Sequence, residues 1–121
     1  MVMLKNAKYT IGEITSNYEH GDRAHGKGYN YKFNYENRSR VDSRQEGEFT
    51  LGRKYLVVYD STNIRSGYLI LDKFDITDSL VKYHIYPKYG MYKVSWSLPK
   101  MPFQYDKSDI EYEVRMNVRS D

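Results

Sequence analysis

The chain has 121 residues, no cysteine and a nearly balanced charge, with 19 Lys and Arg residues against 16 Asp and Glu residues. This length fits a single domain spanning residues 1–121, and the absence of cysteine excludes disulfides, thiolate metal ligands and thiol nucleophiles. The charge is balanced in both halves of the chain, which argues against a dominant phosphate-binding surface. No apolar run approaches the roughly 20 residues of a membrane span, and Met1–Leu4 is shorter than a signal-peptide core. We therefore expect a soluble chain, in a compartment that the sequence leaves open. A domain whose N-terminal anchor had been removed would show the same sequence pattern.

The first half of the chain predicts three strands around a glycine-rich loop. Lys8–Ser16 is rich in β-branched residues, and Gly12 within it indicates a bulge or a close backbone approach. Asn17–Gly28 reads as a mobile loop. Tyr29–Tyr35 alternates aromatic and polar residues and therefore predicts a half-buried strand. Val41–Thr50 has little apolar periodicity and predicts an exposed edge strand.

A hairpin in the middle of the chain carries the most apolar runs. Tyr55–Tyr59 is apolar or aromatic without interruption, so both faces of this strand must be covered and the strand must be interior. Asp60–Asn63 supplies side chains that bond their own backbone and start a turn. Tyr68–Leu71 then forms the return strand, and we expect this hairpin to be the core of the fold.

The second half predicts three further strands. Leu80–Tyr86 alternates, although a short helix capped by Asp78 or Ser79 is the rival interpretation. Met91–Leu98 also alternates, with Tyr92, Val94, Trp96 and Leu98 on one face, and Asp109–Arg119 alternates over five apolar positions. The fold class predicted is therefore all-β, an antiparallel small barrel or sandwich of seven or eight strands with no long helix.

Two motifs suggest ligands but lack the context that those ligands need. Gly21–Gly28 matches a phosphate-binding loop, but Gly28 stands where Ser or Thr should hold magnesium, and a strand follows instead of a helix. His20, Asp22 and His25 share the same loop, but no other motif adds a ligand to the two histidines, and histidines in a glycine-rich loop are usually only solvated. We predict neither nucleotide nor metal nor any other cofactor.

No arrangement of residues predicts catalysis. The chain has no Ser-His-Asp or nucleophile-elbow signature. Glu111 and Glu113 resemble a pair of acid–base carboxylates, but they share their face of the predicted strand with Arg115 and Arg119. A solvated charged face explains them better, so we expect a protein that is not an enzyme and has no catalytic residues.

Two groups of aromatic residues are candidates for binding. The aromatic face of residues 29–35 is first of all expected to form part of the hydrophobic core. The alternatives are a patch that contacts a protein or ligand, or a surface on which the bases of single-stranded nucleic acid stack. The second group surrounds the turn Pro87–Gly90, where a hairpin would gather tyrosines at one end of the domain. We expect the two tyrosines nearest this turn to be exposed. The predicted binding residues are Tyr83, Tyr86, Tyr89 and Tyr92.

The order of three segments resembles a known family. The segments are TIGEIT at Thr10–Thr15, GRKYLVVYDSTN at Gly52–Asn63 and YLILD at Tyr68–Asp72, with a tyrosine-rich strand between the first two. Over roughly residues 9–80 the chain resembles small bacterial β domains of unknown function, frequent in Bacteroidetes and often placed after a membrane or lipoprotein anchor. The resemblance implies a β fold and a bacterial origin, and it brings no catalytic residues.

The predicted function is that of a non-enzymatic bacterial β domain that binds another protein, as an adaptor or an immunity-like protein does. The alternative is a small barrel that binds single-stranded nucleic acid with its aromatic strand. The direction of the side chains of residues 29–35 distinguishes the two hypotheses.

Overall fold

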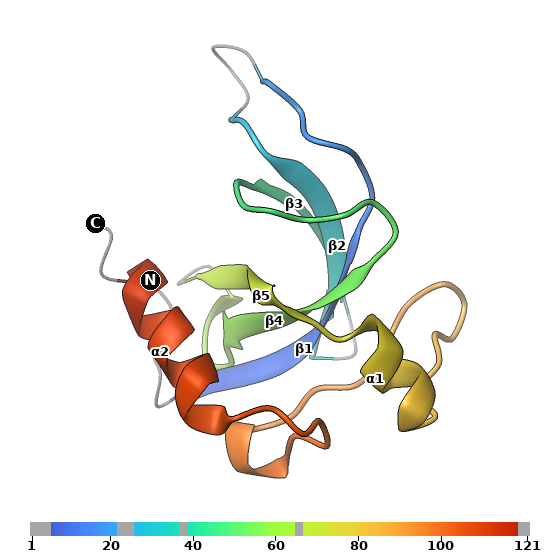
Figure 1. The fold of residues 1–121 in the computed structure, drawn as a ribbon, viewed down its shortest axis with the longest axis vertical. Helices are drawn as coiled ribbons and strands as arrows, with labels where there is room; N and C mark the ends of the chain where they lie inside the picture. Colours follow the sequence, from blue (N-terminus) through green and yellow to red (C-terminus); the bar gives the residue numbers. More distant parts are fainter. Residues whose placement is uncertain (1–5, 22–25, 37–38, 65–66, 119–121) are drawn as a thin grey trace.

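The computed structural model describes residues 6–21, 26–36, 39–64 and 67–118, and these form one antiparallel sheet with helices beside it (Figure 1). The strand order is β3-β2-β1-β4-β5. The strands are β1 (Ala7–Ile14), β2 (Tyr29–Tyr35), β3 (Ser39–Gln45), β4 (Lys54–Asp60) and β5 (Tyr68–Asp75), and the helices are α1 (Thr77–Lys82), the 3-10 helix η3 (Leu98–Lys100) and α2 (Lys107–Val118).

The central hairpin is confirmed. Each of residues 55–59 in β4 is at most 4% exposed, and β4 pairs with β1 along one edge and with β5 along the other. Beyond β4, the carboxylate of Asp60 accepts hydrogen bonds from the backbone N–H groups of Thr62 and Asn63, at 2.9 and 3.3 Å. These bonds build the turn that the polar side chains predict.

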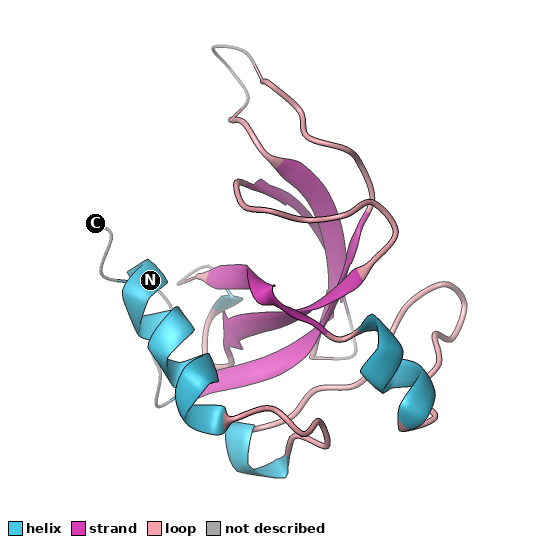
Figure 2. Cartoon of the chain, in the orientation of Figure 1, coloured by secondary structure: helices cyan, strands magenta, loops and turns pink. Residues whose placement is uncertain are grey.

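The alternation of β4 divides the interior into two apolar clusters on opposite faces of the sheet. Leu56 and Val58 belong to the first cluster, which the helices and the second half of the chain cover. Tyr55 and Val57 belong to the second cluster, which is lined by the aromatic residues of β2. Figure 2 shows this division: the helices lie around β1, β4 and β5, whereas β2 and β3 rise away from them.

Close packing inside the second cluster depends on Gly12 of β1. A Cβ atom at this position would lie 2.6 Å from Cγ2 of Val57 and 2.9 Å from Cδ1 of Ile70. A close approach at Gly12, as predicted, is therefore present, but the approaching atoms belong to side chains and not to backbone. Any larger residue would force these two side chains out of their packing.

The edge strands β3 and β5 approach each other without forming a ladder. The side-chain amide of Gln45 accepts a hydrogen bond from the backbone N–H of Ile70 at 3.0 Å and donates one to its carbonyl at 2.8 Å. One carboxamide thus replaces one residue of a neighbouring strand. The sheet is curved but open, with five strands in the described residues, so the antiparallel β class is confirmed while a closed barrel or sandwich of seven or eight strands is wrong.

The predicted strand Asp109–Arg119 is wrong, because its described residues belong to helix α2. In a helix, residues four positions apart share a face. Ile110 and Val114 therefore point into the first cluster and are fully buried, whereas Tyr112 and Met116 are 60% and 49% exposed. The same alternating residues satisfy a helix with one buried and one exposed stripe.

The predicted strands Leu80–Tyr86 and Met91–Leu98 are also wrong. In the first, residues 80–82 belong to α1, the short helix of the rival interpretation, which buries Leu80. The second has only isolated bridges, including one from Trp96 to Tyr9 of β1. The face predicted for the second segment is nevertheless correct. Its four apolar residues pack, half-buried, against the first cluster: Tyr92, Val94, Trp96 and Leu98.

Helix α1 begins without the predicted side-chain cap. Its N-cap residue is Ile76, and neither Asp78 nor Ser79 caps it. Instead, the carboxylate of Asp75 accepts a hydrogen bond from the backbone N–H of Thr77 at 3.0 Å, which satisfies one of the free donors at the start of the helix.

Candidate functional site

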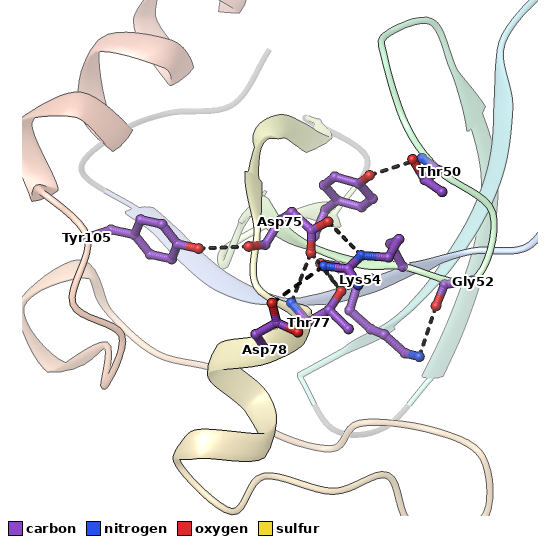
Figure 3. Close-up of polar contacts among 9 residues, drawn as sticks. Thr50, Gly52, Lys54, Asp75, Thr77, Asp78 and Tyr105 are labelled. Atoms are coloured by element: carbon purple, nitrogen blue, oxygen red, sulfur yellow. Dashed lines mark hydrogen bonds and ion pairs between the residues drawn. The ribbon is translucent and has the colours of Figure 1, made fainter.

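The densest polar cluster lies where β5 leads into α1 (Figure 3). Nε of Arg53 donates to Oδ2 of Asp75 at 2.8 Å, and Oγ1 of Thr77 donates to Oδ1 of Asp75 at 2.6 Å. The backbone N–H of Lys54 then donates to Oγ1 of Thr77 at 2.9 Å. We call Arg53, Asp75 and Thr77 the Asp75 latch.

The Asp75 latch is a structural device. Partial burial alone would raise the pKa of Asp75, but the hydrogen bonds from Arg53 and Thr77 outweigh it and hold the pKa below its ordinary value of 3.8. The hydroxyl of Tyr105 also donates to the backbone carbonyl of Asp75, at 2.7 Å. Both carboxylate oxygens are thus used within the chain, and the latch fixes α1 and the loop before α2 to the end of the sheet.

Two hollows in the surface are further candidates. The first, of about 520 Å³, contains Arg44, whose guanidinium is held by Oδ1 of Asn30 at 2.7 Å and by the carbonyl of Gly26 at 2.9 Å. The second, of about 440 Å³, lies between Tyr9 and the side of α2. Burial and the nearby charge of Glu111 raise the pKa of Tyr9 to about 12, so this phenol stays protonated and cannot act as a base near neutral pH.

The tyrosine turn, residues 86–92, is the third candidate, and it projects beyond α1 (Figure 1). Its tip is a two-residue turn in which the backbones of Lys88 and Met91 exchange hydrogen bonds of 2.7 and 3.1 Å. The central residues Tyr89 and Gly90 have φ angles of 53° and 77°. Such tight turns require positive φ at both central positions, and Asn, Asp or Gly normally occupies them.

The four tyrosines predicted to bind fall into two pairs. Tyr83 packs against the first cluster, with its ring edge-on to Phe103 at 6.0 Å, and Tyr92 is half-buried against the same cluster. Tyr86 and Tyr89 are 62% and 91% exposed. The predicted exposure of these two residues is confirmed, and Tyr83 and Tyr92 anchor the segment that carries them. Within the described part of the chain, no ring contact joins two of the four.

The region around the tyrosine turn contains much of the exposed apolar surface. Val81, at the end of α1, is 63% exposed, so three of the six exposed large apolar side chains among the described residues lie between positions 81 and 89. Lys82, Lys88 and Lys93 are exposed in the same region. Charge totals over each half of the chain conceal these lysines, because acidic residues elsewhere in the same half balance them.

The other groups of residues considered from the sequence are less well supported as sites. The aromatic face of β2 points inward, with Tyr31 and Phe33 at 2% and 1% exposure. Glu111 pairs with Arg115 at 3.7 Å on the surface of α2.

Of the glycine-rich loop, Asp22 and His25 lie outside the described residues. The described residues contain no group of three or more His, Asp or Glu side chains that could hold a metal ion, and no helix among them is long and apolar enough to cross a membrane.

Comparison of this chain with protein-family models, with curated proteins and with solved structures found no match.

Proposed function

We propose that this protein is a non-enzymatic bacterial β domain that binds another protein through its tyrosine turn, in an adaptor or immunity-like role. The bacterial origin depends on the resemblance of residues 9–80. The binding residues are Tyr86 and Tyr89, which make the contact, and Tyr83 and Tyr92, which hold the turn against the domain.

One observation carries the proposal: Tyr89 combines left-handed backbone geometry with almost complete exposure. A non-glycine residue at φ 53° costs stability, on the order of 1 kcal/mol, and an aromatic side chain that is 91% exposed gives nothing back through packing. Strained residues of this kind concentrate at binding and catalytic sites. Tyr89 presents an exposed ring and makes no hydrogen bond to an acid or base among the described residues, which favours binding.

The physical properties of tyrosine suit this role. An exposed tyrosine costs the free domain little, because its hydroxyl remains hydrated. When a partner excludes water, the large and rigid ring contributes strongly to affinity, and tyrosine is accordingly enriched among the residues that dominate protein interfaces.

Single-stranded nucleic-acid binding is the alternative. The surface first considered for it, the aromatic face of β2, faces the second apolar cluster and offers no open platform for bases. A nucleic acid would therefore have to use the tyrosine turn as well, and the experiment must distinguish the two kinds of partner.

Site-specific photocrosslinking tests the proposal. A photoreactive phenylalanine analogue replaces Tyr89 in the full chain, expressed in the organism that encodes it, and replaces Tyr112 in a matched control. Tyr112 is also exposed, at 60%, but lies on α2. We expect a discrete protein adduct from position 89 that position 112 does not give. The proposal fails if position 89 yields no adduct beyond the control, or if the adduct is nucleic acid.

A further inference from the structure

The segment that carries the tyrosine turn has an unusual charge distribution. Residues 79–105, between Asp78 and Asp106, contain four lysines and no Asp or Glu. The rest of the chain has 15 basic and 16 acidic residues, so the net positive charge of the protein comes from this one segment.

The positive charge at the turn is not neutralised within the described residues. Lys88 and Lys93 are exposed, and no described carboxylate forms an ion pair with either of them. Asp78, which precedes the segment, lies 3.9 Å from Arg53 of the Asp75 latch. Lys82 donates to the side-chain oxygen of Gln104 at 3.4 Å, a neutral partner that leaves its charge in place.

A carboxylate does approach the base of the turn. Burial, and after it the charge of Glu13 of β1, raises the pKa of the Tyr92 phenol. Glu13 and Lys32 line the same small hollow with Gly90 and Met91. At this hollow, β1 contributes the negative charge of Glu13 and β2 contributes the positive charge of Lys32. These two charges balance each other and do not compensate the lysines of the turn.

We infer that the partner of the tyrosine turn presents a carboxylate-rich protein segment, whose Asp and Glu side chains pair with Lys88 and Lys93 while apolar atoms cover Tyr86 and Tyr89. This inference depends on the proposed function, because it specifies the chemistry of the partner at the same surface. Complementary charge at the edge of an aromatic contact accelerates association and selects among partners.

The experiment extends the crosslinking at position 89. The crosslinked peptides are sequenced, and capture is repeated with Lys88→Glu and Lys93→Glu together. The matched control reverses two lysines that are equally exposed elsewhere, Lys27→Glu and Lys73→Glu. A further pair, Lys88→Gln and Lys93→Gln, separates loss of attraction from added repulsion, and thermal melting of each variant checks its fold.

We expect the reversal at 88 and 93 to lower the yield of the adduct about tenfold or more, the Gln pair to lower it less, and the control reversal to leave it unchanged. Raising the salt from about 0.1 M to 1 M shortens the screening length from about 10 Å to about 3 Å, and should weaken capture as well. The crosslinked peptides should be rich in Asp and Glu.

The outcomes separate the two claims. A position-89 protein adduct that survives charge reversal, or that contains no acidic peptides, overturns the acidic partner and leaves protein binding standing. An absent adduct overturns both. A nucleic-acid adduct also overturns both and supports the alternative function.

Discussion

The two ends of helix α1 differ in how the chain uses its polar and aromatic groups. At the N-terminal end, the Asp75 latch satisfies the Asp75 carboxylate with Arg53 and Thr77, and Tyr105 donates to the backbone there. Beyond the C-terminal end, the tyrosine turn leaves a strained aromatic residue in water, with lysines around it. Both regions are rich in groups capable of binding, but only the second leaves exposed side chains available to a partner.

This difference guides the search for function in a domain without a catalytic signature. A dense polar network attracts attention, yet a network whose oxygens are all used internally has little left for a partner. An exposed residue whose geometry costs stability gives better evidence, because the turn requires positive φ at position 89 but does not require a tyrosine there. We expect stability to reside in the sheet and the Asp75 latch, and binding to reside in the turn.

The largest expected effect concerns the interior of the sheet. Ile70→Ala or Val58→Ala should lower the free energy of unfolding by about 1–4 kcal/mol, since each removes buried methyl groups and leaves a cavity between tightly packed neighbours. Chemical denaturation measures the change. Leu51→Ala, at a position 48% exposed, is the control and should change little. An unchanged denaturant midpoint for the buried variants would show that stability does not reside in this hairpin.

The Asp75 latch should give a smaller, pH-dependent effect. Asp75→Asn should destabilise the protein by about 1 kcal/mol at pH 7, a discounted figure because water reaches both Asp75 and Arg53. The folded-state pKa of Asp75 lies below its ordinary value of 3.8, so its charge stabilises the fold at higher pH and stops doing so as pH falls through the lowered pKa.

Urea denaturation of the wild type and Asp75→Asn at pH 7, 5 and 2.5 tests this sign. The difference between the two proteins should be the same at pH 7 and 5 and should shrink at pH 2.5. A difference that stays constant, or that grows with acidity, would contradict the assignment of Asp75 as a charged latch.

The sheet could be predicted largely from the sequence because burial leaves a simple pattern in strands. The bounds of β2 match the predicted Tyr29–Tyr35, and β4 is interior because an unbroken apolar run requires cover on both faces. α2 could not be predicted from alternation alone, because residues at every second position also place Ile110 and Val114 one helical turn apart. The sequence contained one signal for this helix: Asp106, a residue type that commonly caps helices, directly precedes it. In the structure, its carboxylate accepts a hydrogen bond from the backbone N–H of Ser108 at 2.9 Å, as an N-cap residue does.

The candidate site was predicted in part. Tyr86 and Tyr89 could be expected on the surface because the chain near Pro87 has no core left to cover. The left-handed backbone of Tyr89 could not be predicted, because Lys-Tyr-Gly-Met does not carry the Asn-Gly or Asp-Gly signature of such turns. The run of 27 residues without an acidic side chain was countable in the sequence, although totals over half-chains conceal it.

The strain at Tyr89 makes its own prediction. Tyr89→Asn should raise the free energy of unfolding by about 0.5–1 kcal/mol, since Asn tolerates positive φ better than Tyr and no packing is lost. Thermal and chemical denaturation measure the gain. Tyr86→Asn is the control, because Tyr86 is exposed but does not have positive φ, and it should bring no gain. Equal stabilisation by both changes would point to removal of exposed aromatic surface and not to relief of strain.

The smallest effect on stability should accompany a large effect on binding. Tyr86→Ala and Tyr89→Ala should each leave the melting temperature within a few degrees of the wild type, because neither side chain packs against the core. Each should nevertheless reduce capture of the crosslinked protein when the photoreactive residue stands at the other tyrosine, at position 89 for Tyr86→Ala and at position 86 for Tyr89→Ala, because a large ring at the centre of an interface contributes far more than the contacts around it. Tyr112→Ala removes a ring that is 60% exposed on α2 and should affect neither measurement. If Tyr86→Ala or Tyr89→Ala unfolds the protein while the folded fraction still binds, the residue is part of the fold, and the contrast between the two ends of α1 disappears.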